Sequence, residues 1–95
     1  MKNEKYVVVR SNMAGVFCGT LKNKNGTEVV LANARKIYRW QGAYTVEDIA
    51  VKGLNADTSQ ITVSVEEIVV DDVCQVLPTT DTAQKILTEA PIWTF

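Results

Sequence analysis

Short apolar runs separated by turn-forming residues dominate the first third of the chain and predict β-strands. The run at 6–10 (YVVVR) is rich in β-branched residues, and the small residues at 11–15 favour a turn after it. A second run at 16–21 leads to the Asn25-Gly26 pair, whose residues accept positive φ in a tight hairpin turn. Residues 28–31 are then expected to return as the paired strand.

The returning strand is expected to continue, after a bulge near Asn33, as far as Trp40. Side chains along a strand point alternately to opposite faces of the sheet. This period of two would place on one face Lys36, Tyr38 and Trp40. It would place on the other face Arg35, Ile37 and Arg39.

Two short helices are predicted in the second half of the chain. Thr45 can cap the first helix, acidic residues follow in its first turn, and Gly53 is placed to end it. The apolar face of this helix would consist of Val46, Ile49, Ala50 and Leu54. The second helix is capped by Thr80 or Asp81 and ends before Pro91.

Further strands are predicted between the two helices. Residues 61–65 alternate apolar with small polar side chains, as in a strand with one buried face, before two glutamates interrupt the pattern. The stretch 68–77 predicts one bulged strand or two short ones, ended by Pro78. Together the elements predict a single α+β domain over 1–95, with a small, mostly antiparallel sheet or partly closed barrel of about five strands and two short helices.

Charge is divided between the two halves of the chain. Residues 1–44 carry eight Lys or Arg against two acids, and residues 45–95 carry two against nine, so the formal net charge is only −1. Within the basic half, the segment 34–42 (ARKIYRWQG) contains three cations, two large aromatic residues and no acid. This mixture suits phosphates and stackable rings.

Composition weakens several classes of function. The chain contains no histidine, the residue most used for proton transfer near neutral pH and for binding transition metals. No stretch approaches the roughly 18 apolar residues that span a bilayer, and no signal-peptide pattern precedes the first strand. Cys18 and Cys74 lie among apolar residues, as buried free thiols do, and a disulfide is not expected. We therefore expect a cytoplasmic protein without catalytic activity, metal, cofactor or membrane contact.

The first candidate site joins the turn at 10–15 to the basic aromatic segment at 35–42. Small residues in the turn would let backbone N–H groups approach ligand oxygens, arginines would bind phosphates, and Tyr38 or Trp40 would stack on bases. The alternative is that both aromatic rings fill the core and the cations only protect a solvated strand edge.

A second candidate is an acidic set whose carboxylates could attract a hard cation such as magnesium. It consists of Glu66, Glu67, Asp71 and Asp72. Because its spacing matches no cation-binding loop, we prefer a solvated acidic edge, or a surface that pairs with the basic half of another subunit. The apolar C-terminal residues 90–95 are expected to dock on their own domain.

Several stretches of the chain resemble a small phage-encoded domain family of unknown function. They are YVVVRS at 6–11, AGVF at 14–17, GTL at 19–21, GTEVVL at 26–31, NAR at 33–35, Tyr38, Trp40, GA at 42–43, IA at 49–50 and APIW at 90–93. The resemblance implies an anti-CBASS type of sponge, since some members of this kind bind cyclic nucleotide signals of the infected bacterium and sequester them without cleavage. It also implies a location in the cytoplasm of the infected bacterial host.

A cyclic dinucleotide such as cyclic GMP-AMP would offer two phosphates to arginines and two purines to aromatic rings. The candidate ligand-binding residues are Arg10, Ser11, Ala14, Gly15, Arg35, Tyr38, Arg39, Trp40 and Gly42. Asn12-Met13 departs from the family pattern, which has an aromatic and a small residue there, so the resemblance does not predict which base is chosen.

Two other functions stay open. A single-stranded nucleic-acid-binding module would use the same cations and aromatic rings, although the net charge of −1 disfavours it. A protein-interaction inhibitor would dock its divided surface on a host factor of complementary charge. We also expect a homo-oligomer, in which opposite charges of neighbouring subunits pair.

Overall fold

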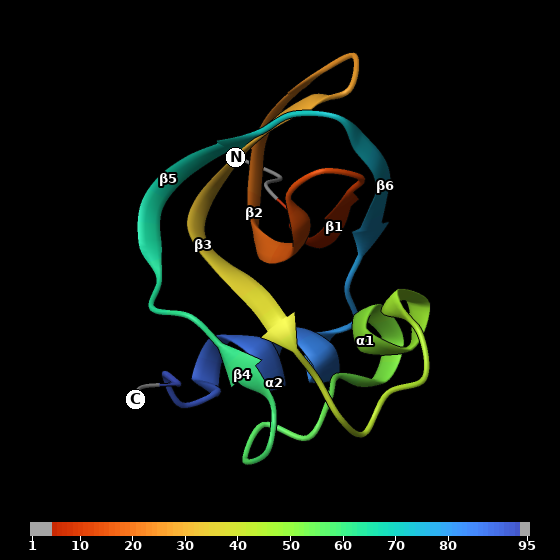
Figure 1. The fold of residues 1–95 in the computed structure, drawn as a ribbon, viewed down its shortest axis with the longest axis vertical. Helices are drawn as coiled ribbons and strands as arrows, with labels where there is room; N and C mark the ends of the chain where they lie inside the picture. Colours follow the sequence, from red (N-terminus) through yellow and green to blue (C-terminus); the bar gives the residue numbers. More distant parts are fainter. Residues whose placement is uncertain (1–4, 94–95) are drawn as a thin grey trace.

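The strands of this protein form one antiparallel sheet in a computed structural model that describes residues 5–93 (Figure 1). They are β1 (Tyr6–Ser11), β2 (Gly15–Asn25), β3 (Glu28–Arg39), β4 (Gln60–Ile61), β5 (Val65–Val70) and β6 (Val73–Pro78). The order across the sheet is β4-β3-β2-β1-β6, and β5 pairs with the N-terminal part of β3.

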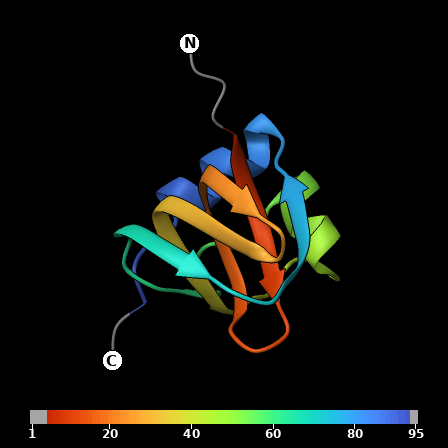
Figure 2. The same cartoon turned by 90° about the horizontal axis from the view of Figure 1, so that it is seen from above.

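Two short helices complete the fold, α1 (Val46–Lys52) and α2 (Asp81–Glu89). They lie together on one side of the strongly curved sheet (Figure 2). The predicted α+β class is therefore confirmed. The sheet has six strands rather than about five, because the stretch 68–77, predicted as one bulged strand or two short ones, is divided between β5 and β6.

The long β2–β3 hairpin follows from local sequence. Its loop is Gly26-Thr27, one residue later than predicted: Asn25 still pairs with Glu28, and Gly26 has a φ of 63°. The expected bulge at Asn33 is confirmed, because the register shifts there and Asn33 has a φ of 50°. A bulge adds one residue to one strand and so changes which side chains face the interior.

Both helices begin and end as predicted. The Asp48 N–H donates to Thr45 Oγ1 at 3.3 Å, and the Ala83 N–H donates to Thr80 Oγ1 at 3.1 Å. These N-cap bonds satisfy donors that the first turn of a helix leaves free. Gly53, with a φ of 83°, ends α1 and donates its N–H to the Ile49 carbonyl at 2.9 Å.

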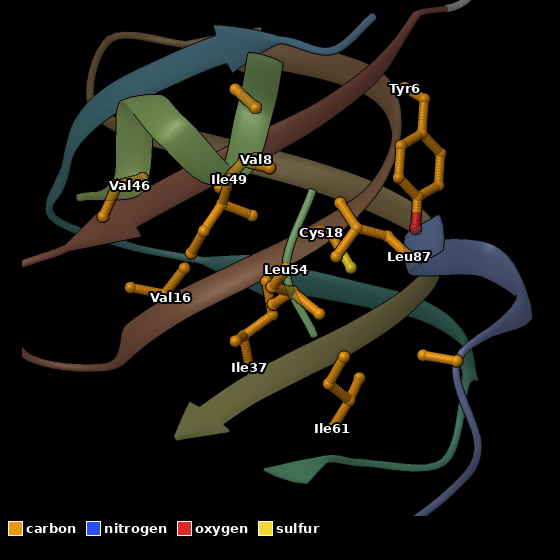
Figure 3. Close-up of a cluster of buried hydrophobic side chains, with 12 residues drawn as sticks. Tyr6, Val8, Val16, Cys18, Ile37, Val46, Ile49, Leu54, Ile61 and Leu87 are labelled. Carbon is orange, nitrogen blue, oxygen red and sulfur yellow. The ribbon is translucent and has the colours of Figure 1, made fainter. Parts of the chain in front are cut away.

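Buried side chains form two clusters on the two faces of the sheet. The first packs alternate residues of β1 to β3 against both helices, and Figure 3 shows its members around Ile49 and Leu87. The second gathers the remaining alternate residues, including Val7, Val9 and Phe17. Because β1 contributes to both clusters, its apolar run is nearly continuous rather than alternating.

The predicted strand at 61–65 is wrong. β4 ends at Ile61, residues 62–64 leave the sheet, and β5 begins at Val65 and runs through both glutamates. Thr62 explains the break, since its hydroxyl accepts the Lys36 N–H at 2.9 Å where a strand would use a carbonyl. The Thr62 carbonyl can therefore accept a hydrogen bond from the Arg35 side chain of β3.

The cysteines and the C-terminal segment lie as follows. Both cysteines are free, and Cys18 is buried as predicted, whereas Cys74 is exposed on β6, contrary to expectation. The segment after α2 docks on its own domain as expected, because Ala90 is buried and the Trp93 N–H donates to the Ile61 carbonyl at 2.9 Å. The expected docking of residues 94 and 95 lies outside the described residues.

Candidate functional site

Two shallow depressions flank the end of β3. The first has a volume of about 470 Å³ and is lined by Tyr38, Arg39, Trp40, Gln41, Thr58 and Gln60. The second has a volume of about 360 Å³ and is lined by Asn12, Met13, Ala14, Gly15, Val16, Lys36, Ile37, Tyr38 and Trp40. Because Tyr38 and Trp40 belong to both, we call the two depressions together the aromatic surface.

The two shared aromatic residues differ in their burial. Tyr38 is 61% exposed, and the Arg39 guanidinium lies 5.8 Å from its ring centre. Trp40 is half-buried, and one part of it packs against the first core cluster. The two predicted alternatives, rings that face a ligand and rings that fill the core, therefore apply differently to the two residues. Tyr38 faces solvent, whereas Trp40 packs partly on the core and partly lines the depressions.

The segment after β3 is fixed by hydrogen bonds to the loop that precedes β4. The Gln41 N–H donates to Ser59 Oγ at 3.0 Å, and the Gln41 carbonyl accepts the Asn55 N–H at 2.7 Å. These bonds place Thr58 and Gln60 beside the aromatic rings. Sequence reasoning missed both residues, because nothing local links them to β3.

The turn between β1 and β2 is shaped by Ser11. This residue is buried; its hydroxyl donates to the Asp71 carbonyl at 2.8 Å and accepts the Ala14 N–H at 3.2 Å. Gly15 follows with a φ of 105°, and a Cβ there would lie 3.4 Å from Lys36 Cε. The hydrogen bonds of Ser11 thus hold the turn in place, and Ala14 and Gly15 line the aromatic surface.

Lys36 is a lining cation that was not among the candidate residues. It is partly buried, and its ammonium lies 5.8 Å from the centre of the Phe17 ring. The two-residue period had already placed it on the face of Tyr38 and Trp40, and this was the signal that could have identified it.

Arg10 and Gly42 line neither depression. Arg10 is exposed on β1, where its positive charge is a minor cause of the lowered pKa of Glu47; the main cause is the hydrogen bond from Gln75, at 2.9 Å. Gly42 has a φ of 84°, and a Cβ there would lie 2.9 Å from the Asn55 nitrogen. Gly42 therefore allows the backbone after β3 to approach the loop that contains Asn55.

Arg35 lies inside the molecule, away from the aromatic surface. It is only 5% exposed, and its guanidinium donates to three backbone carbonyls. These are the carbonyls of Thr62 at 2.8 Å, Leu87 at 2.8 Å and Pro91 at 3.3 Å. The side chain thus joins β3 to the end of α2 and to the segment that follows it.

The surroundings of Arg35 include two titratable groups, Tyr6 on β1 and Cys18 on β2. Burial raises the pKa of Tyr6 well above its ordinary value of 10.0, and the neighbouring Cys18 adds to the rise. Burial also raises the pKa of the Cys18 thiol, while Tyr6 and Arg35 oppose that rise. Both groups are therefore neutral in the folded protein at neutral pH.

The acidic set does not gather into a cation site. Glu66 and Glu67 are exposed on β5, and Asp71 and Asp72 form the turn to β6, where Asp72 has a φ of 57°. Within residues 5–93, no group of three Cys, Asp or Glu side chains is arranged to hold a metal ion. No helix in that part of the chain is long and apolar enough to cross a membrane.

Comparison with known proteins gives one match. A family model described as a domain of unknown function (DUF6948) matches residues 4–87. No curated protein and no solved structure matches the chain.

Proposed function

Since this chain belongs to the DUF6948 family, whose function is unknown, we propose a function for it from its geometry: it binds a cyclic dinucleotide on the aromatic surface and sequesters it without cleavage. The nucleotide would be an immune signal such as cyclic GMP-AMP, and the protein would act in phage counter-defence. The resemblance of the sequence to sponge proteins motivates the proposal, and the aromatic surface provides a place for the ligand.

One observation carries the proposal: an exposed Tyr38 and a half-buried Trp40 line two depressions, one together with Arg39 and the other together with Lys36. Two bases could stack on the rings while the cations meet the phosphates, which is the combination that nucleotide recognition uses. Neither depression is lined by a carboxylate that would repel a phosphate.

The lining residues also favour binding over chemistry. Apart from the two cations, they offer hydroxyl, amide, aromatic and aliphatic groups, but no activated nucleophile and no carboxylate for general base catalysis. Because both depressions are shallow, we propose that a second copy of the chain completes the enclosure of the ligand. A homo-oligomer of this kind would explain why large side chains such as Met13, which is 86% exposed, stand in the open.

The first test is titration calorimetry of the purified protein against a panel of cyclic di- and trinucleotides, with short single-stranded DNA included. We expect saturable binding of one cyclic nucleotide and its recovery intact after denaturation. Binding of the DNA alone, with a steep loss of affinity as salt rises, would instead support a nucleic-acid-binding module.

Matched tyrosine variants locate the site. Tyr38→Ala should weaken binding of that nucleotide at least about tenfold, because one base loses its stacking partner. Tyr44→Ala should change nothing, since Tyr44 is 91% exposed but lines neither depression. Equal effects of the two substitutions, or no binding across the panel, would refute the proposal.

A further inference from the structure

β5 lies at an open edge of the sheet. Its residues, Val65–Val70, pair with β3 along one side (Figure 1), and no other strand among residues 5–93 pairs with them. Their backbone forms no further hydrogen bond in the part of the chain that the structure describes. An edge strand carries backbone N–H and C=O groups that point away from the sheet. We call this unpaired side of the strand the β5 edge.

The β5 edge lacks several features that keep a sheet edge from accepting another strand. Such features are bulges, prolines, lysines and a very short strand. β5 pairs with β3 without a register shift, and its sequence, VEEIVV, contains no proline or lysine. The strands at the two ends of the sheet order differ, because β4 has only two residues and β6 ends in Pro78. β5 is therefore the edge best able to accept an added strand.

Both faces of β5 carry apolar and acidic side chains. Val65, Glu67 and Val69 alternate onto one face, where Val65 is 41% exposed and Val69 is 54% exposed. Glu66 and Ile68 lie on the other face, and Ile68 is half-buried against the second core cluster. Apolar side chains that stay exposed beside unpaired backbone groups indicate a surface that binds another chain.

Charge determines which kind of strand the β5 edge can accept. Residues 65–72 contain no cation and four acids, which are Glu66, Glu67, Asp71 and Asp72. None of these carboxylates forms an ion pair with a residue of 5–93. Two copies of this edge would bring like charges together across the new strand pair, which destabilises the pairing. A second copy of the β5 edge is therefore disfavoured as the occupant, and a basic strand is favoured.

We propose that the β5 edge binds an extended basic segment of another protein by strand addition. The backbone of the segment pairs with β5 and adds one strand to the sheet. Apolar side chains of the segment cover Val65 and Val69, and its Lys or Arg side chains lie opposite Glu66 and Glu67. The site is independent of the proposed nucleotide function, because no residue of β5 lines either depression of the aromatic surface.

The experiment uses a synthetic peptide that complements the β5 edge. Its sequence is Lys-Lys-Val-Val-Ile-Lys-Lys-Val, which in antiparallel order places a lysine opposite each acid and an apolar residue opposite each apolar residue of 65–72. The control peptide has the same side chains but carries methyl groups on its central amide nitrogens, so it keeps the charge and cannot pair as a strand. Fluorescence anisotropy at about 0.15 M salt measures binding. Amide hydrogen exchange followed by NMR locates the peptide.

We expect the first peptide to bind saturably and the methylated control to bind at least about tenfold more weakly, because the backbone hydrogen bonds are lost. Alternate amides of Val65–Val70 should become protected from exchange, since every second N–H of an edge strand points toward the added strand. Glu67→Lys should raise the dissociation constant about fivefold, and a peptide with glutamate opposite position 67 should restore the affinity. Glu89→Lys, an exposed charge reversal on α2, should raise it less than about twofold.

Three results would overturn the proposal. The first is no binding of the complementary peptide, or equal binding of the two peptides, which would leave only charge attraction. The second is an equal effect of Glu67→Lys and Glu89→Lys, or binding without protection of the β5 amides, because the peptide would then lie elsewhere. The third is protection of these amides in the protein alone that disappears on dilution, because a second copy of the chain would already occupy the edge.

Discussion

Two arginines of β3, Arg35 and Arg39, have opposite environments although only four residues separate them. Arg35 is buried and donates to three backbone carbonyls, whereas Arg39 is exposed and lies over the Tyr38 ring. The first joins strand to helix, and the second is available to a ligand. The comparison teaches that a cationic segment in a sequence can contain structural and ligand-binding cations side by side.

The position along β3 gives a physical reason for this difference. Ala34 and Arg35 point to opposite faces of the sheet, and both are buried because each face carries a core cluster. The curvature of the sheet lets Ala34 enter the second core cluster while Arg35 reaches the end of α2. After Ile37 the strand nears its end, and the side chains from Tyr38 onward reach solvent or the aromatic surface.

The largest expected effect comes from removing the interior cation. Arg35→Met should lower the free energy of unfolding by about 3–5 kcal/mol, because buried carbonyls lose their donors. Arg39→Met, the matched exposed control, should stay within about 0.5 kcal/mol of wild type. Urea unfolding followed by circular dichroism measures both. Similar losses in the two variants would contradict the division of roles.

Trp40 should contribute both to the stability of the core and to nucleotide binding on the aromatic surface. Trp40→Ala should lower the free energy of unfolding by about 2 kcal/mol, roughly half the cost for a fully buried tryptophan. It should also weaken nucleotide binding, whereas Tyr38→Ala should affect binding alone. Unfolding and calorimetry on the same two proteins test this. A Trp40→Ala variant of wild-type stability would show that the ring contributes nothing to the core.

Most of the fold could be predicted because its signals are local. The caps at Thr45 and Thr80, the end of α1 at Gly53 and the bulge at Asn33 depend on residues within one turn of each feature. The break after Ile61 was missed because it depends on hydrogen bonds between Thr62 and β3, which the alternating pattern at 61–65 does not encode.

The candidate site could be predicted only in part, for a similar reason. Sequence placed Ala14 and Gly15 with Tyr38 and Trp40, and the structure brings these four together. It also grouped Arg35 with them, because a two-residue period cannot show that a long side chain will turn toward carbonyls of a distant helix. Thr58 and Gln60 reach the site through loop contacts and carry no signal of their own.

The alkaline limit of stability should report on the buried Tyr6 hydroxyl. Tyr6 has a raised pKa in the folded protein, so above about pH 10 the unfolded chain releases a proton that the folded chain keeps. The Tyr6 contribution is therefore fully present below pH 10 and is lost as pH rises further. Each such group lowers the free energy of unfolding by up to about 1.4 kcal/mol per pH unit. The raised pKa of Cys18 also lowers the free energy of unfolding at alkaline pH, and its effect begins near the ordinary thiol pKa of 9.0.

Tyr6→Phe isolates the tyrosine contribution. Between about pH 10 and pH 11 the variant should lose about 1 kcal/mol less stability than wild type. Urea unfolding at several pH values compares the slopes, and Tyr38→Phe should follow wild type because Tyr38 is exposed. Parallel curves for all three proteins would mean that Tyr6 ionises in the folded state as it does in the unfolded chain.

The smallest expected effect concerns the partly buried cation of the aromatic surface. Lys36→Gln should change the free energy of unfolding by less than about 0.5 kcal/mol. It should nevertheless weaken nucleotide binding about fivefold at low salt and reduce the salt dependence of the affinity, because one phosphate contact is lost. Lys52→Gln is the control, since this exposed lysine of α1 pairs with Asp48, at 3.9 Å, and lines neither depression. If both variants bound the nucleotide alike at every salt concentration, Lys36 would not contact the phosphates, and Arg39 would be the cation left to recognise them.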